Sequence, residues 1–295
     1  MTTRRRALQV LSGAGVALAA ATPSAAALRE RKKAPPDAVG LLYDSTKCVG
    51  CRACSNACRE VSGLSPDVAT IQGVAYDAPT DLDARNRTII KLYAGEGKTA
   101  YVKAQCMHCV DPACAGACML GALKKREMGI VSWDGSKCVG CRYCQTVCPF
   151  NVPKFEWTSL NPKIVKCELC KDRIADGKIP ACAEACPRSA IVYGTREALL
   201  EEAKRRLAGN PYLYVQRVYG ETEFGGTQVL YITSVPFEKL GLPEKGDEPV
   251  PEVSETVQHA VYQGFVAPVA LYGILAGVLW RNRRQNGAGD EEASS

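Results

Sequence analysis

The sequence is poor in the residues from which most active sites are built. It contains only two histidines among 295 residues, no nucleophile or acid–base pair stands out, and the aspartates and glutamates are spread as ordinary solvated charge. The net charge is a modest +6, and Arg4, Arg5 and Arg6 supply three of the positive charges. No basic stretch is interleaved with aromatic residues, which make up 7% of the chain, so no nucleic-acid partner is indicated.

Cysteine, by contrast, is abundant: the chain has 16, although a protein of this length can build a core without disulfide staples. The cysteines fall into four quartets, of which the first and third have the spacing C-x2-C-x2-C-x3-C. The middle gap is four residues in the second quartet and eleven in the fourth. In chain order the quartets are Cys48, Cys51, Cys54, Cys58; Cys106, Cys109, Cys114, Cys118; Cys138, Cys141, Cys144, Cys148; and Cys167, Cys170, Cys182, Cys186.

This spacing indicates iron–sulfur clusters. Three thiolates three residues apart can converge on one cuboidal cluster, while the fourth ligand comes from another quartet. Zinc is an alternative, but a zinc ribbon uses two separated C-x2-C pairs and has no use for the third cysteine in Cys48-Cys51-Cys54. A disulfide scaffold is a second alternative, but cysteines so close in sequence would close small, strained loops.

The N-terminus has the pattern of a signal peptide. A basic start is followed by an Ala/Gly-rich stretch from Val10 to Ala21 and by the small run Ala25-Ala26-Ala27. The paired arginines before Ala7-Leu8 resemble a twin-arginine leader, which is an address for exporting folded proteins. Clusters would then be inserted in the reducing cytoplasm before export. The alternative is a chance basic N-terminus ahead of an Ala-rich arm.

The C-terminal region predicts a membrane anchor. Val257–Trp280 has no Asp, Glu, Lys or Arg over 24 residues, and a helix of that length spans roughly 36 Å against a hydrocarbon core of about 30 Å. Arg281, Arg283 and Arg284 follow at once, so the positive-inside rule places the C-terminus in the cytoplasm. The alternative is a buried soluble helix.

Local patterns predict several elements around the cysteines. A β-hairpin is expected from Thr88–Tyr93 and Lys98–Lys103, with glycines at the turn, and short strands at Gly129–Trp133, Ala190–Gly194 and Gln228–Thr233. Thr195 is expected to cap a helix that ends at Gly209-Asn210-Pro211. We expect its apolar stripe, Leu200, Ala203 and Leu207, to pack against the cluster-bearing body.

Three further features are ambiguous in the sequence. His108 could hydrogen-bond a cluster sulfur or meet a partner, but an exposed spacer is the commoner role in such a turn. His259 is expected to be an interfacial anchor, with a role near quinone chemistry as the alternative. The run Lys124-Lys125-Arg126 is expected to be a solvated loop that could steer an acidic docking face.

The quartets resemble those of four-cluster electron-transfer subunits of molybdopterin oxidoreductases and membrane-linked hydrogenases. Within that superfamily the chain most resembles the iron–sulfur subunit of quinone-linked nickel–iron hydrogenases of the hydrogenase-2 type. The residues that carry this resemblance are Tyr101–Cys109, Gly140–Cys144, Cys148–Lys154, Lys166–Cys170, Gly225–Leu230 and Gln258-His259. A leader and an anchor in one chain fit this subtype, whereas formate-dehydrogenase electron-transfer subunits usually share the anchor and lack their own leader.

The resemblance implies how the quartets pair, first with fourth and second with third. Four 4Fe–4S clusters would be held by Cys48, Cys51, Cys54 and Cys186; by Cys58, Cys167, Cys170 and Cys182; by Cys106, Cys109, Cys114 and Cys148; and by Cys118, Cys138, Cys141 and Cys144. It further implies an α+β fold of two bacterial-ferredoxin-like two-cluster modules with inserted hairpins, plus a single C-terminal transmembrane helix. No catalytic residue is expected.

The expected organisation runs from an exported N-terminus to a cytoplasmic tail. The segments are a twin-arginine signal peptide (1–27), a lead-in (28–47), the four-cluster body (48–194), a helix and strand extension (195–237), a linker (238–255), the transmembrane helix (256–280) and the tail (281–295). The body would lie on the periplasmic face of the inner membrane, anchored in the lipid bilayer.

The expected function is electron relay between a periplasmic nickel–iron hydrogenase, with its small and large subunits, and an integral-membrane quinone-reducing subunit. The first alternative is that the same chain of clusters serves formate dehydrogenase or another molybdopterin oxidoreductase. A metal-stapled structural or adaptor protein is the second.

Overall fold

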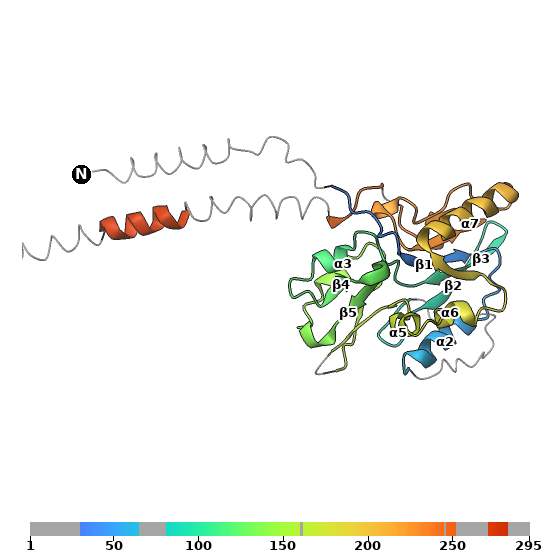
Figure 1. The fold of residues 1–295 in the computed structure, drawn as a ribbon, viewed down its shortest axis with the longest axis horizontal. Helices are drawn as coiled ribbons and strands as arrows, with labels where there is room; N and C mark the ends of the chain where they lie inside the picture. The colour runs from blue at the N-terminus through green and yellow to red at the C-terminus, as the bar shows by residue number, and fades with distance from the viewer. Residues whose placement is uncertain (1–29, 65–80, 160–161, 245, 252–270, 283–295) are drawn as a thin grey trace, which may run out of the picture. The chain divides into compact units, whose positions relative to one another are not determined.

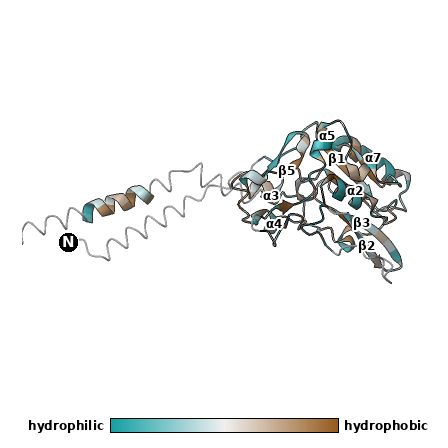
Figure 2. Ribbon diagram, turned by 90° about the horizontal axis from the view of Figure 1, so that it is seen from below, coloured by the Kyte–Doolittle hydropathy of each residue, from teal (hydrophilic) through white to brown (hydrophobic). Residues whose placement is uncertain are grey.

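The computed structural model describes residues 30–64, 81–159, 162–244, 246–251 and 271–282. Residues Arg31–Pro251 form one compact unit, in which the labelled helices and strands of Figure 1 lie. The expected signal peptide, His259 and most of the expected membrane segment lie outside the described residues. Residues 271–282 are helical, and Figure 2 shows this helix mostly in the hydrophobic colours. No helix in the described part of the chain is long and apolar enough to cross a membrane.

A three-stranded sheet organises the compact unit. Its central strand β1 (Val39–Asp44) pairs antiparallel with β8 (Ile191–Thr195) and parallel with β9 (Val229–Ile232). All six residues of β1 are buried. The predicted strands at Ala190–Gly194 and Gln228–Thr233 are therefore present, each end displaced by one residue, whereas β1 was not predicted.

Helix α7 (Arg196–Gly209) covers one face of this sheet. Thr195 Oγ1 accepts a hydrogen bond from the Ala198 N–H at 3.4 Å, so the predicted cap is present, and the helix ends at Gly209 with Asn210 as its C-cap. The predicted stripe needs correction: Leu199, rather than Leu200, is buried with Ala203 and Leu207. These side chains pack on the sheet residues Leu42, Leu230 and Ile232 and not on the cysteines, because the sheet lies between.

The opposite face of the sheet packs toward the cysteines. Because side chains alternate along a strand, Leu41 and Tyr43 of β1 point away from α7. With Tyr231 of β9 they belong to one buried cluster that also contains Cys54 and Cys182. The sheet thus separates helix α7 from the cysteine-bearing half of the molecule.

The predicted hairpin consists of β2 (Ile89–Gly95) and β3 (Lys98–Ala104). Its two-residue turn, Glu96-Gly97, has φ values of 52° and 71°, the left-handed pair that matches the twist of a hairpin. Two tyrosines fasten β3 to the sheet. Tyr43 Oη donates to the Tyr101 carbonyl at 2.9 Å, and Tyr231 Oη donates to the Lys103 carbonyl at 2.5 Å.

The remaining elements are short and surround the cysteines. Helix α2 (Ala53–Val61) packs on α6 (Ala181–Glu184), and α3 (Ala113–Gly116) packs on α4 (Tyr143–Thr146). Figure 1 shows α3, β4 and β5 grouped apart from α2, α5 and α6. The other members are helix α5 (Lys171–Ala175), the pairs β4 (Leu123–Lys125) with β5 (Val131–Trp133) and β6 (Lys154–Phe155) with β7 (Ile164–Val165), and the 3-10 turns Glu127–Gly129, Gly135–Lys137, Glu223–Gly225 and Phe237–Leu240. The predicted strand at Gly129–Trp133 begins only at Val131, because Met128 and Gly129 have positive φ and form a turn.

Candidate metal centres

All sixteen cysteines lie in the described residues, and every thiol is free. Cys51 and Cys141 are exposed, and the others are half-buried or buried. The disulfide alternative therefore finds no support. Within the described residues, no group of three or more His, Cys, Asp and Glu side chains is placed to hold a single metal ion.

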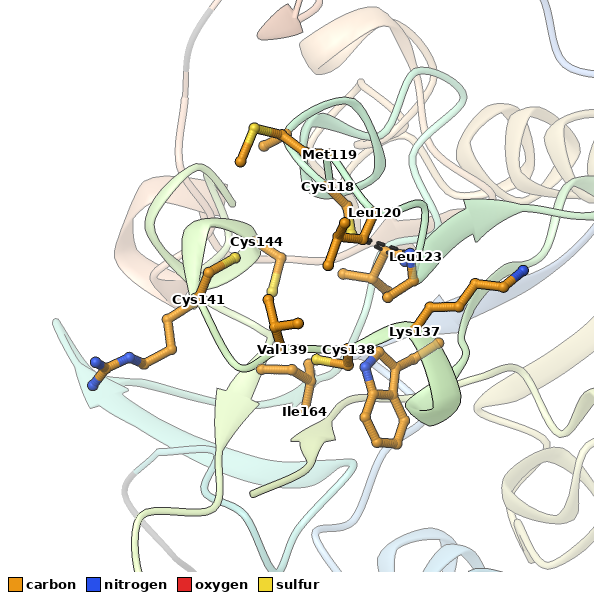
Figure 3. Close-up of a pocket in the computed structure, with 14 residues that line it drawn as sticks. Cys118, Met119, Leu120, Leu123, Lys137, Cys138, Val139, Cys141, Cys144 and Ile164 are labelled. Carbon is orange, nitrogen blue, oxygen red and sulfur yellow. Dashed lines mark hydrogen bonds between the residues drawn. The ribbon is translucent and has the colours of Figure 1, made fainter. Parts of the chain in front are cut away.

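One cavity is lined by cysteines of the second and third quartets. Cys118, Cys138, Cys141 and Cys144 surround a space of about 250 Å³ whose other walls include Leu123 and Ile164. Figure 3 shows the four sulfur atoms distributed around it. Burial, together with the charges of Cys118, Cys138 and Cys141, raises the pKa of Cys144 to about 11. These four thiols thus act on one another across a small, largely apolar space.

A second cavity brings the first and fourth quartets together. It is lined by Cys48, Cys51, Cys54 and Cys186. Tyr43 of β1 and Ile90 of β2 form part of its wall. The pKa of Cys54 is raised by burial first, and Cys48 and Cys186 add to the increase.

The other eight cysteines interact in two further sets. Cys58, Cys167 and Cys170 line one cavity, and burial, with Cys167 and Cys58, raises the pKa of Cys182 to about 12. In the second set, burial raises the pKa of Cys109 well above its usual value, and Cys106, Cys148 and Cys114 contribute. Every thiol whose pKa shifts is thus perturbed by burial first, and deprotonation to a ligand requires nearby positive charge or metal.

The same backbone turn recurs in all four quartets. The residue two places after the first cysteine is Gly50, His108, Gly140 or Leu169, and each has a positive φ, between 48° and 70°. The Gly50 N–H donates to Cys48 Sγ at 3.5 Å, and the Leu169 N–H donates to Cys167 Sγ at 3.4 Å. Such N–H···S bonds orient the sulfur and favour its thiolate form.

The last cysteine of three quartets also accepts backbone donors. The Ala122 N–H donates to Cys118 Sγ at 3.2 Å, and the Ala190 N–H donates to Cys186 Sγ at 3.3 Å. Backbone hydrogen bonds likewise lower the pKa of Cys148 against the larger, opposite effect of burial. All-thiolate donors around apolar cavities, with N–H groups aimed at sulfur, fit a cubane cluster.

His108 is not an exposed spacer, which corrects the expectation. It is fully buried, and its Nδ1 accepts the Val131 N–H at 3.0 Å, so the second quartet is tied to β5. Burial, with the charges of Lys166 and Lys125, holds the pKa of His108 well below its usual value. The imidazole is therefore neutral, and it is not available to a partner at the surface.

The run Lys124-Lys125-Arg126 is also not a plain solvated loop. Lys124 and Lys125 belong to strand β4, which turns Lys125 inward while Lys124 and Arg126 stay exposed. The Lys125 Nζ donates to the Cys109 carbonyl at 2.8 Å and to Gln228 Oε1 at 3.2 Å. Burial lowers the pKa of Lys125 to about 8.

Two buried lysines were missed by sequence reasoning. Lys103 and Lys166 are 1% and 2% exposed. Each lies shortly before a C-x2-C motif, but so do Lys47 and Lys137, which are not buried. The pattern in the sequence therefore does not distinguish them.

Comparison with known proteins agrees with this site. A family model described as a 4Fe–4S dicluster domain matches residues 98–196. The chain is 37% identical to the "Hydrogenase-2 operon protein HybA" of Escherichia coli O157:H7, over 98% of this chain and 99% of that protein. The chain belongs to the HybA family. It is also 36% identical to the "Formate dehydrogenase, nitrate-inducible, iron-sulfur subunit" of Escherichia coli (strain K12), over 81% of each chain.

Membership of the HybA family indicates the role of the sixteen cysteines. The chain is an electron-transfer iron–sulfur subunit of the kind found in oxidoreductase complexes. Its cofactors are 4Fe–4S clusters, and sixteen cysteines at four per cluster correspond to four of them.

Proposed function

We propose that this chain relays electrons between a periplasmic nickel–iron hydrogenase, made of a small and a large subunit, and an integral-membrane quinone-reducing subunit. The observation that favours hydrogenase over formate dehydrogenase is the share of the chain that each relative matches. The similarity to HybA extends over 98% of the chain, whereas the similarity to the formate dehydrogenase subunit covers 81%. The HybA-like similarity therefore reaches into the chain ends, where the expected leader and anchor lie.

Four ligand sets follow from the pairing of first with fourth and second with third quartets. They are Cys48, Cys51, Cys54, Cys186; Cys58, Cys167, Cys170, Cys182; Cys106, Cys109, Cys114, Cys148; and Cys118, Cys138, Cys141, Cys144. The shared cavities and the mutual pKa effects within each set support this assignment. The packing of α2 on α6 and of α3 on α4 supports it too.

Charge effects between the sets support a linear order. Cys54 acts on Cys182, Cys167 acts on Cys106, and Cys144 acts on Cys114, which links the first set to the second, the second to the third, and the third to the fourth. The exposed cysteines, Cys51 and Cys141, belong to the first and fourth sets. Cubane clusters accept and release single electrons without ligand rearrangement. The protein residues contribute spacing, burial and hydrogen bonds.

We further propose export by the twin-arginine leader (1–27) and anchoring by residues 256–280, with the tail 281–295 in the cytoplasm. The described end of this segment is helical and carries exposed apolar side chains, including Leu271, Leu275 and Leu279. Removal of residues 256–295 should release the iron-loaded body into the soluble periplasmic fraction. A truncated chain that still sediments with membranes after its partners are deleted would contradict the anchor.

The relay is tested in membranes of the native host. Without this chain, we expect hydrogen to reduce an artificial dye as before, because the catalytic subunits are intact, while hydrogen-dependent quinone reduction is lost. Co-purification should recover a nickel protein. Recovery of a molybdopterin protein instead, with loss of formate-dependent quinone reduction, would favour the formate dehydrogenase alternative. A colourless protein without iron would contradict both.

A further inference from the structure

Lys103 carries a buried positive charge that no carboxylate of the described residues balances. Its Nζ donates to Thr88 Oγ1 at 2.5 Å and to Gln105 Oε1. Both acceptors are neutral, and the residue is only 1% exposed. A buried ammonium without a counter-charge costs several kcal/mol, so an ion of opposite sign is expected nearby.

The position of Lys103 in the hairpin points to that ion. Lys103 pairs with Ile90 across the hairpin, and directly opposed side chains lie on the same face. Ile90 lines the cavity of the first ligand set, while its neighbour Ile89 packs with Cys106 and Cys167. The hairpin therefore runs past several cysteine sets, and the Tyr231 hydroxyl holds it there through the Lys103 carbonyl.

The charges that act on Lys103 come from two of these sets. Burial alone would lower the pKa of Lys103, but Cys182, Cys54, Cys167 and Cys58 outweigh it, and the pKa is raised. Cys54 belongs to the first proposed set and the other three to the second. The effect is mutual, because Lys103 is the strongest influence that lowers the pKa of Cys54 and of Cys182 against burial.

We propose that the Lys103 ammonium is the shared buried counter-charge of the first two ligand sets and raises the reduction potentials of both clusters. This inference rests on the ligand sets of the proposed function. Four thiolates leave each loaded site with net negative charge, and reduction adds one more. A fixed cation that acts on both sites stabilises the reduced state of each cluster more than the oxidised state, and burial protects this effect from salt.

The experiment compares midpoint potentials of the purified, iron-loaded full chain. Lys103→Met removes the charge and keeps a chain of similar length. Lys91→Met is the matched control, because Lys91 lies in the same hairpin with its side chain 35% exposed and paired to Asp81. Iron and sulfide content are measured first, and the clusters are then titrated by electron paramagnetic resonance at fixed potentials.

We expect Lys103→Met to lower the reduced-to-oxidised ratio of two of the four clusters at least tenfold at a given potential. For a one-electron couple this corresponds to a midpoint about 59 mV lower. The other two clusters and the Lys91→Met variant should be unchanged, and Lys103→Arg should restore most of the effect. Four unchanged midpoints, or four equal shifts, would overturn the proposal.

A second pair of variants keeps Lys103 in place. Thr88→Asp puts a carboxylate where the Thr88 hydroxyl now accepts from Nζ, so it should lower the same two potentials. Thr88→Val removes only the hydrogen bond and should leave them unchanged. If Thr88→Asp leaves every midpoint of a fully loaded protein unaltered, the counter-charge role is wrong even when Lys103→Met does not assemble.

The two levels of inference fail in different ways. A parent protein without four titrating clusters would contradict the proposed function. Four titrating clusters that ignore both the Lys103 and the Thr88→Asp substitutions would contradict only the role of Lys103.

Discussion

Asp44, the last residue of β1, and Arg206, near the end of α7, form an ion pair of 3.0 Å in which the carboxylate is fully buried. The Tyr214 hydroxyl donates to the same carboxylate oxygen at 3.0 Å, and the Thr46 hydroxyl donates to the other at 2.6 Å. All these contacts lie at one end of the central strand. They fix where the helix sits on the sheet that backs the cysteine half of the molecule.

Arg206→Met should destabilise the protein by about 3 kcal/mol or more, because it leaves the Asp44 carboxylate buried without its partner. The measurement is chemical denaturation followed by circular dichroism. Lys204→Met is the matched control. Lys204 lies on the same helix and pairs with Glu221, but its side chain is 58% exposed, so loss of this pair should cost less than about 1 kcal/mol. Equal effects of the two substitutions would show that burial of the pair is unimportant.

Glu202 should make the stability of the same region depend on pH in the acidic range. Burial opposes ionisation of Glu202, but hydrogen bonds and charges of Arg206 and Arg205 outweigh it, so its pKa lies below the usual value. A carboxyl group with a lowered folded pKa stabilises the fold fully above its unfolded pKa of about 4.3, and this contribution is lost as the pH falls through the folded value.

We therefore expect Glu202→Gln to lower the thermal midpoint at pH 7 and the difference from the parent to shrink below about pH 4.3. The exposed neighbour Glu201 supplies the control, Glu201→Gln. A difference that stays constant from pH 7 to acid would show that the Glu202 charge does not contribute.

Gly50 and Gly140 occupy the same position in the first and third quartets, and both have φ of 70°. A Cβ on Gly50 would lie 2.3 Å from the Tyr101 ring, whereas one on Gly140 would lie 3.3 Å from the Phe155 ring. Both Gly→Ala variants bear the cost of about 1–2 kcal/mol for left-handed backbone. Gly50→Ala additionally forces the Tyr101 ring to move.

Gly50→Ala should therefore lose iron from the first ligand set, while Gly140→Ala should keep its full iron content with reduced stability. Iron per chain and the denaturation midpoint distinguish the two. If both variants load iron equally, the Tyr101 ring accommodates the added carbon and the steric argument fails.

Removal of the clusters should loosen the two halves of the molecule unequally. Around the second and third quartets, α3 and α4 have four residues each, and β6 and β7 have two. Elements this short are not stable by themselves. The sheet and α7, in contrast, have an apolar core that contains no cysteine.

After iron chelation, amide hydrogen exchange should become fast across residues 106–165 and stay slow in β1, β9 and α7. Mass spectrometry of peptides from the loaded and iron-free protein measures this directly, with the loaded protein as control. Uniform loss of protection would mean that the clusters stabilise the whole body as one unit.

The sequence predicted best what depends on covalent spacing. The quartets, the hairpin turn and the Thr195 cap are local patterns, and each is recognisable within a few residues. Strand β1 was missed because its partners, β8 and β9, lie far away in the chain, so nothing near Val39–Asp44 reveals them. Leu199 replaced Leu200 for the same reason, since the direction of the helix is set by the sheet beneath it.

Burial of polar residues was the least predictable feature. His108 was expected to be an exposed spacer in a cysteine turn, but it is buried and its Nδ1 accepts a hydrogen bond from the Val131 N–H of β5. Lys103 alternates with apolar residues in a strand and has no distinguishing neighbour in the sequence. Only the three-dimensional proximity of Cys54 and Cys182 makes its charge informative.

The parallel pairing of β1 with β9 has a consequence for biosynthesis. β1 is made near the start of the chain, and its partner ends at Ile232, well after Cys186, the last of the sixteen cysteines. Every cysteine has therefore been translated before the strand that completes the sheet. Tyr43 forms part of the wall of the cavity of the first ligand set. We expect this wall to remain unfolded during that interval, so that the iron–sulfur assembly machinery has access to the first site until late in synthesis.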